Sequence, residues 1–174
     1  MSIWIRALCT VPVDALTPED LCAGIAERLP LLAATYGEGG DQETIARLSV
    51  EVATPAGPAP QASVWLLRYR EGEGFLRVER WSEPAAVAEE VGELREGLTD
   101  CDDEGVDDVR ALLADVVETV GLELKMSDVE GIGWAVAIGA AACFAARGKG
   151  LVQADGEGWM APRGNEVEHV LDGD

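Results

Sequence analysis

The sequence predicts a single α+β domain over residues 1–174, in which a mixed or mainly antiparallel sheet packs against three to four helices. Apolar residues recur with a period of two between residues 44 and 82, as they do in strands with one buried face. Other segments show helical spacing of their apolar residues. A chain of 174 residues is also long enough to bury a substantial core.

The expected strands are short apolar or alternating runs bounded by proline, glycine or charged turns. They cover residues 3–11, 46–52, 64–70, 75–81, 122–126, 151–154 and 158–161. We expect the second, third and fourth of these runs to form an antiparallel meander with loops at 55–60 and 71–74. The last two form a hairpin across the turn at 155–157.

The expected helices begin at capping residues and carry apolar side chains at helical spacing. Thr17 is the N-cap of the first helix, Pro18 opens it, and Pro30 is expected to kink or end it early. Residues 84–98 and 106–120 predict two amphipathic helices joined by an acidic loop.

A helix rich in alanine and glycine is expected near 128–147. The capping-box pattern at 127–130 precedes it, and Gly148 ends it. Its apolar run of about 15 residues is shorter than the roughly 20 needed to cross a bilayer. We therefore expect a buried core helix, with Trp134, Ile138 and Phe144 buried, and no association with a membrane.

Charge is the unusual property of this chain. It has 33 acidic and 13 basic side chains, a formal net charge of −20 in 18.4 kDa. Such a field repels nucleic acid and anionic membranes and attracts basic proteins. The four cysteines form no C-x-x-C pair, which predicts reduced thiols, and no export signal is visible at the N-terminus. We therefore expect a cytoplasmic location.

The densest acidic segment, residues 100–108, begins like a calcium loop. Asp100, Asp102, Glu104 and Gly105 match its first, third, fifth and sixth positions, but the twelfth position, which needs a bidentate glutamate, is Ala111. The pattern therefore predicts no calcium site. It predicts a solvated loop that leads into a helix whose start favours acids.

Motifs that carry catalysis or cofactor binding are not found in the sequence. Its one histidine, His169, lies beside two glutamates near the C-terminus, and no G-x-S-x-G elbow accompanies it. The glycine-rich stretches at 37–40 and 148–150 lack the spacing of phosphate-binding loops. We therefore expect no catalytic residue, no cofactor and no metal.

Two surfaces are candidates for binding a partner. Residues 83–125 hold 14 acidic and 3 basic side chains, a net charge of −11. The predicted partner-binding residues in this segment are Glu89, Glu93, Glu96, Asp100, Asp102, Asp103, Glu104, Asp107 and Asp108. The other candidate is the segment 68–81, where four arginines alternate with aromatic residues. Arginine and aromatic side chains are common interface hot spots, but they also stabilise sheet faces by cation–π contacts.

In its charge and α+β architecture, and loosely in its Gly156-Glu157-Gly158-Trp159 turn, the chain resembles the immunity proteins that bacteria encode against toxins. The resemblance implies a non-enzymatic inhibitor that masks a basic toxin. One alternative is a small enzyme or metal-dependent module that uses the cluster at 100–108. Another is a structural subunit of a larger complex.

Overall fold

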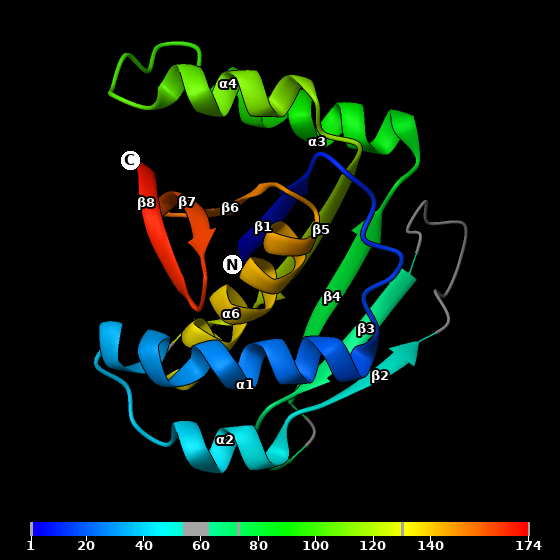
Figure 1. Ribbon diagram of the computed structural model, residues 1–174, viewed down its shortest axis with the longest axis vertical. Helices are drawn as coiled ribbons and strands as arrows, with labels where there is room; N and C mark the ends of the chain where they lie inside the picture. Colours follow the sequence, from blue (N-terminus) through cyan, green and yellow to red (C-terminus); the bar gives the residue numbers. More distant parts are fainter. Residues whose placement is uncertain (1, 54–62, 73, 130, 174) are drawn as a thin grey trace.

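The strands of the computed structural model form one antiparallel sheet in the order β2-β3-β4-β5-β1-β6-β7-β8 (Figure 1). The structure describes residues 2–53, 63–72, 74–129 and 131–173, so the loop expected at 55–60 lies outside the described residues. The strands are β1 (Ile3–Cys9), β2 (Ser49–Ala53), β3 (Ser63–Arg68), β4 (Leu76–Trp81), β5 (Glu118–Leu124), β6 (Leu151–Ala154), β7 (Gly158–Arg163) and β8 (Glu166–Asp172). The prediction of an α+β fold with a mainly antiparallel sheet is confirmed.

Helices cover both faces of this sheet. They are α1 (Pro18–Thr35), α2 (Asp41–Arg47), α3 (Pro84–Gly97), α4 (Val106–Ala114), α5 (Met126–Val129) and α6 (Ile132–Arg147). Helices α1 and α6 share one apolar core with the sheet, and α3 and α4 share a second core with its other face. Figure 1 shows α3 and α4 side by side, remote from α1 and α2.

Strand β1 lies in the middle of the sheet, between β5 and β6, and contributes to both cores. Ile5, Ala7 and Cys9 pack against the α1 and α6 side, while Leu8 packs against the α3 and α4 side. This two-sided burial follows from the period of two in a strand. It explains why residues 3–9 form a nearly continuous apolar run rather than an alternating one.

Helix α6 spans Ile132–Arg147, and 13 of its residues are buried. Trp134 is 9% exposed, and Ile138 and Phe144 are fully buried. The expected capping box is wrong, because Gly131 is the N-cap of α6 and caps it with no side-chain hydrogen bond. The carboxylate of Asp128, from the expected box, instead accepts hydrogen bonds from the Tyr69 hydroxyl and from Arg70.

The first helix confirms its predicted cap but not its predicted break. The Thr17 hydroxyl accepts a hydrogen bond from the amide of Asp20, and the Asp20 carboxylate accepts one from the amide of Thr17. Helix α1 nevertheless continues through Pro30 to Thr35. Pro30 is exposed, so its ring does not disturb the core, while buried Leu29 and Leu32 on either side anchor the helix.

The predicted boundaries are wrong at two junctions between a helix and a strand. Residues 41–47 form α2, with an ion pair of 2.7 Å between Glu43 and Arg47, so the strand expected from residue 46 begins only at Ser49. Helix α4 ends at Ala114, not at residue 120, and β5 begins at Glu118. The sequence between them is rich in β-branched residues, which favour strands, and central pairing with β1 and β4 completes the switch.

Candidate protein-binding face

All nine predicted partner-binding residues lie on one layer, made of α3, α4 and the connection between them at residues 98–105. The structure places Glu89, Glu93 and Glu96 on α3, Asp100, Asp102, Asp103 and Glu104 on the connection, and Asp107 and Asp108 in the first turn of α4. All nine are exposed. We call these nine residues the acidic face and the layer that carries them the α3–α4 layer.

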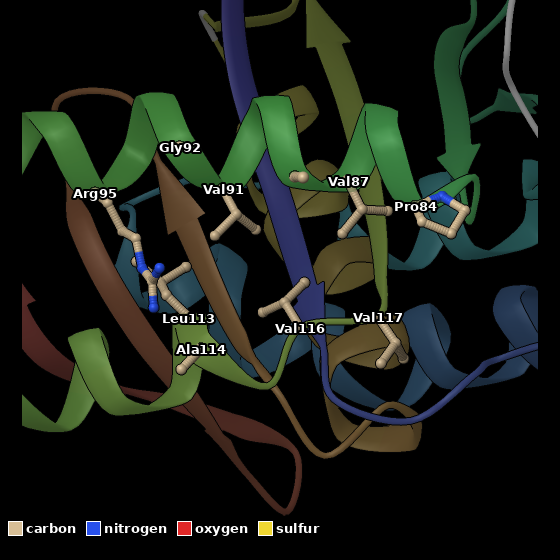
Figure 2. Close-up of a pocket in the computed structure, with 10 residues that line it drawn as sticks. Pro84, Val87, Val91, Gly92, Arg95, Leu113, Ala114, Val116 and Val117 are labelled. Atoms are coloured by element: carbon tan, nitrogen blue, oxygen red, sulfur yellow. The ribbon is translucent and has the colours of Figure 1, made fainter.

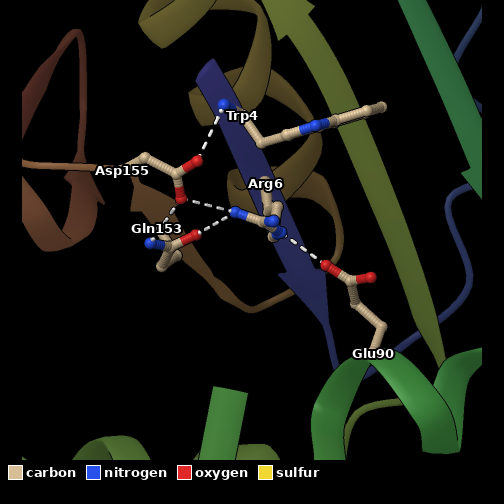
Figure 3. A network of polar contacts seen from close by, with 5 residues as sticks. All are labelled: Trp4, Arg6, Glu90, Gln153 and Asp155. Atoms are coloured by element: carbon tan, nitrogen blue, oxygen red, sulfur yellow. Dashed lines mark hydrogen bonds and ion pairs between the residues drawn. The ribbon is translucent and has the colours of Figure 1, made fainter. Parts of the chain in front are cut away.

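Arg6 of β1 anchors α3 to the sheet. Its guanidinium donates to the Glu90 carboxylate on α3, to the Gln153 side chain at 2.7 Å and to the Asp155 carboxylate at 2.8 Å (Figure 3). The Asp155 carboxylate also accepts from the amide of Trp4. Glu90 is thus directed inward, whereas Glu89 and Glu93 beside it are exposed to solvent.

Arg110 of α4 holds the acidic connection in place. Its guanidinium donates to the backbone carbonyl oxygens of Leu98 at 2.6 Å and Cys101 at 2.8 Å, and to the Asp107 carboxylate at 3.2 Å. Gly105 precedes α4 with a φ of +93°, and a Cβ at this position would lie 2.4 Å from the Val170 carbonyl oxygen. A cation and a close backbone contact therefore fix a segment dense in negative charge.

The carboxylates of the acidic face are largely left without cationic partners. Among the described residues, Asp107 is the one member of the nine that makes an ion pair, with Arg110, and its side chain is still 94% exposed. Asp103 accepts only a weak contact of 3.7 Å from the Cys101 thiol. The negative potential of this layer is therefore directed toward solvent, where it can act on another molecule.

In the second candidate surface, the arginine-rich segment 68–81, the arginines are paired within the chain. Each of its four arginines has an acidic partner on the same chain, and the pairs are Arg68 with Glu51, Arg70 with Asp128, Arg77 with Glu79, and Arg80 with Glu118. The Arg80 pair is buried, and the Arg80 guanidinium also lies 5.9 Å from the centre of the Trp65 ring. Arg80 is thus taken up within the fold, whereas the side chains of Arg68, Arg70 and Arg77 are paired but remain 38–47% exposed.

The α3–α4 layer also has an apolar groove, which the sequence does not predict. Figure 2 shows Val87 and Val91 of α3 facing Leu113 of α4 and Val116 and Val117 of the segment that follows. The groove has a volume of about 390 Å³. Its two valines at 116 and 117 were expected inside a helix, and only the early end of α4 leaves them free to line the opening. We call it the valine groove.

The cysteines and the single histidine are the remaining groups with reactive side chains. Burial raises the pKa of the Cys9 thiol to about 12 and that of the Cys143 thiol to about 11, so both stay protonated near neutrality. All four cysteines are free. His169 is exposed on β8, 3.8 Å from Asp172. Within the described ranges, no three His, Cys, Asp or Glu side chains gather closely enough to hold a metal ion.

Comparisons with known proteins found no match to this chain among family models, curated proteins or solved structures. In the part of the chain that the structure describes, no helix combines the length and apolar composition needed to cross a membrane. The geometry and charge of the α3–α4 layer are therefore the basis on which a function is inferred.

Proposed function

We propose that this protein is a non-enzymatic inhibitor that binds a basic partner protein through the acidic face, in the manner of an immunity protein that neutralises a toxin. The observation that carries the proposal is the acidic face itself. Nine exposed carboxylates lie on two helices and their connection, and one of them is ion-paired among the described residues. A concentration of unneutralised charge on an anchored surface favours fast capture of an oppositely charged protein.

The polar contacts that attach the α3–α4 layer to the rest of the fold support the same proposal. Arg6 and Arg110 are used to fix α3 and the connection, and neither guanidinium screens the outward carboxylates beyond the contact of Arg110 with Asp107. A surface that is already ordered loses little conformational entropy when a partner binds. The arginines of segment 68–81, by contrast, are already paired with carboxylates, which favours the acidic face as the interface.

The proposal is tested by affinity capture from the native host. The bait is the wild-type chain or an acidic-face variant that carries Asp102→Asn, Asp103→Asn, Asp107→Asn and Asp108→Asn. We expect the wild-type chain to retain a basic protein whose recovery falls strongly with the variant, because four of the nine charges are lost. Mass spectrometry identifies the retained protein.

A control variant separates the position of the charges from their number. It carries Glu19→Gln, Glu27→Gln, Glu43→Gln and Glu166→Gln. These substitutions change the net charge by the same amount, and their positions are exposed and lie outside the α3–α4 layer. We expect this variant to retain the partner as the wild-type chain does. Equal losses with both variants, or a retained partner that is acidic, would contradict the proposal.

A further inference from the structure

A pocket of about 350 Å³ lies where the end of α1, the start of α6 and the turn between β6 and β7 meet. Its volume is at the small end of the range for ligand pockets. Tyr36, Glu38, Trp134, Asp155 and Glu157 are among the residues that line it. Apart from Trp134, the lining residues are partly or fully exposed, so the pocket opens at the surface and is not a gap in the core. We call it the aromatic pocket.

Two aromatic side chains contribute to the wall of this pocket. Tyr36 is the C-cap of α1, and Trp134 lies in the first turn of α6. Their ring centres are 6.4 Å apart, and the ring planes meet at 84°. Aromatic rings that stand at an angle beside an opening favour an organic cation, because the face of each ring carries negative partial charge.

Two carboxylates that have no cationic partner line the same pocket. Among the described residues, Glu38 and Glu157 make no ion pair, although both are partly buried. The Glu38 carboxylate lies at the start of α6, with its Oε2 atom 3.9 Å from the place that a Cβ on Gly131 would take. Burial raises the pKa of the Tyr36 hydroxyl, and the negative charge of Glu157 adds to this effect. Both carboxylates therefore lie beside the aromatic wall.

The charges around the pocket leave it negative. Asp155, the third carboxylate of the lining, is paired with Arg6 at 2.8 Å (Figure 3). The start of α6 supplies the equivalent of about half a positive charge, so about one and a half negative charges of Glu38 and Glu157 remain. No lysine or arginine is found among the described residues that line the pocket. One bound cation would therefore balance most of the remaining charge.

Backbone hydrogen bonds hold the segments that carry these carboxylates. The amide of Glu38 donates to the carbonyl oxygen of Ala33 at 2.7 Å, just after α1. In the turn that carries Glu157, the amide of Asp155 donates to the carbonyl oxygen of Trp4 at 3.1 Å, and the Asp155 carboxylate accepts from the amide of Trp4 at 3.0 Å. A ligand that binds between segments already held in place loses less free energy in ordering them.

The chemistry of the lining favours a guanidinium group over other organic cations. The carboxylates are hydrogen-bond acceptors, and a quaternary ammonium group has no N–H to donate to them. A guanidinium has five N–H donors in one plane, which suits carboxylates, and its weakly hydrated face stacks on aromatic rings. The lysine ammonium is more strongly hydrated and lacks such a face. Arginine is accordingly the side chain that satisfies both parts of the lining.

The aromatic pocket adjoins the acidic face. Asp155 and Gly156 line both this pocket and a second one, whose lining also includes Glu93 and Asp103 of the acidic face. A protein bound on the acidic face can therefore reach the aromatic pocket across a single turn.

We propose that the aromatic pocket binds an arginine side chain of the basic partner protein, whose guanidinium lies against Tyr36 and Trp134 and donates to Glu38 and Glu157. This inference rests on the proposed function and adds to it one anchoring residue of the partner. The acidic face attracts the partner, and the pocket then retains it. Arginine and aromatic residues in such pockets are the common hot spots of interfaces, and they act mainly on the dissociation rate.

Nuclear magnetic resonance tests the pocket without the natural partner. The probes are Nα-acetyl-arginine amide and its citrulline counterpart, which has nearly the same shape and no charge. The indole N–H signal of Trp134 reports binding, and that of Trp65 on β3, outside the pocket, is the internal reference. We expect the arginine probe to shift the Trp134 signal saturably at millimolar concentrations, and the citrulline probe to bind at least about tenfold more weakly.

Variants identify the groups that bind the probe. Glu38→Gln combined with Glu157→Gln removes both charges and keeps the size of the side chains, and we expect it to weaken the arginine probe at least about tenfold. Glu27→Gln combined with Glu166→Gln is the matched control, because both positions are exposed and outside the lining, and it should leave binding unchanged. Tyr36→Leu keeps an apolar side chain but removes one ring, which should weaken the probe roughly two- to fivefold.

Dissociation of the captured partner connects the pocket to the proposed function. We expect the partner to leave the variant with Glu38→Gln and Glu157→Gln at least about tenfold faster than it leaves the matched control. Binding of the arginine probe together with an unchanged dissociation rate would assign the pocket to a free guanidinium compound and overturn the inference. Equal binding of the citrulline probe, or no shift of Trp134, would also overturn it, although capture through the acidic face can still hold.

Discussion

Arg110 donates a hydrogen bond of 2.6 Å to the backbone carbonyl oxygen of Leu98, which joins the middle of α4 to the end of α3. The same guanidinium reaches the carbonyl of Cys101 and the carboxylate of Asp107. One cation thereby orders the connection that carries four of the nine carboxylates of the acidic face. The repulsion among these carboxylates is partly offset by the Arg110 guanidinium, which binds the backbone of the connection.

Replacing Arg110 with leucine should loosen the connection at 98–105. Two carbonyl oxygens lose a charged donor, and we expect a loss of about 1–3 kcal/mol in the free energy of unfolding, measured by urea denaturation. Amide hydrogen exchange across 98–105 should accelerate. Arg95→Leu removes the same charge from the same layer, and because no hydrogen bond of its guanidinium is found among the described residues, we expect its effect to stay within about 0.5 kcal/mol. Equal effects of the two substitutions would show that Arg110 does not hold the connection.

Phe144→Ala should be among the most destabilising substitutions in the chain. Phe144 is fully buried on α6, and its ring centre lies 5.8 Å from that of Trp65 on β3, so the residue joins the helix to the sheet. The cavity left behind should lower the free energy of unfolding by about 3–5 kcal/mol in a reversible urea melt. Leu31→Ala on α1 is the control, because Leu31 is 46% exposed and should change stability little. A loss below about 1 kcal/mol for Phe144→Ala would place α6 at the periphery.

Alkaline pH should destabilise the fold through its buried thiols. The pKa of Cys9 is raised from about 9 to about 12 by burial and by nearby Glu118. A raised folded pKa gives a stabilisation that is complete below the unfolded pKa and is lost as pH rises through the folded one, here between about pH 9 and 12. The loss reaches at most about 1.4 kcal/mol per pH unit for one thiol. Cys9→Ala should make this part of the stability profile shallower in urea melts between pH 8 and 11, and an unchanged slope would contradict the assignment.

Local signals in the sequence predict much of the fold. Thr17, Pro18 and Asp20 form a cap whose hydrogen bonds are all within four residues, so the start of α1 follows from the sequence alone. The hairpin of β6 and β7 likewise follows from its turn residues. Pro30 shows the limit of local rules, because burial of Leu29 and Leu32 outweighs the helix-breaking tendency of one exposed proline.

The errors fall where tertiary contacts decide. Val116 and Val120 continue the helical spacing of α4, yet pairing of β5 with β1 and β4 converts this stretch into a central strand. The acidic face could be predicted because exposed charge is visible in composition. Arg6 contacts residues that are distant from it in sequence, and Arg110 donates to backbone carbonyl oxygens, which any residue type provides. The valine groove exists only because α4 ends early. No spacing rule reports such features.

The salt dependence of the association rate tests the central claim most directly. Stopped-flow fluorescence would follow binding of the captured partner to the wild-type chain, to the acidic-face variant and to the control variant, at ionic strengths from about 0.02 to 0.5 M. We expect the acidic-face variant to associate about tenfold more slowly at low salt and with a flatter salt dependence, because long-range attraction is lost. Its unfolding midpoint should stay the same or rise as self-repulsion falls. An association rate and a salt slope equal to those of the wild-type chain would contradict binding through the acidic face.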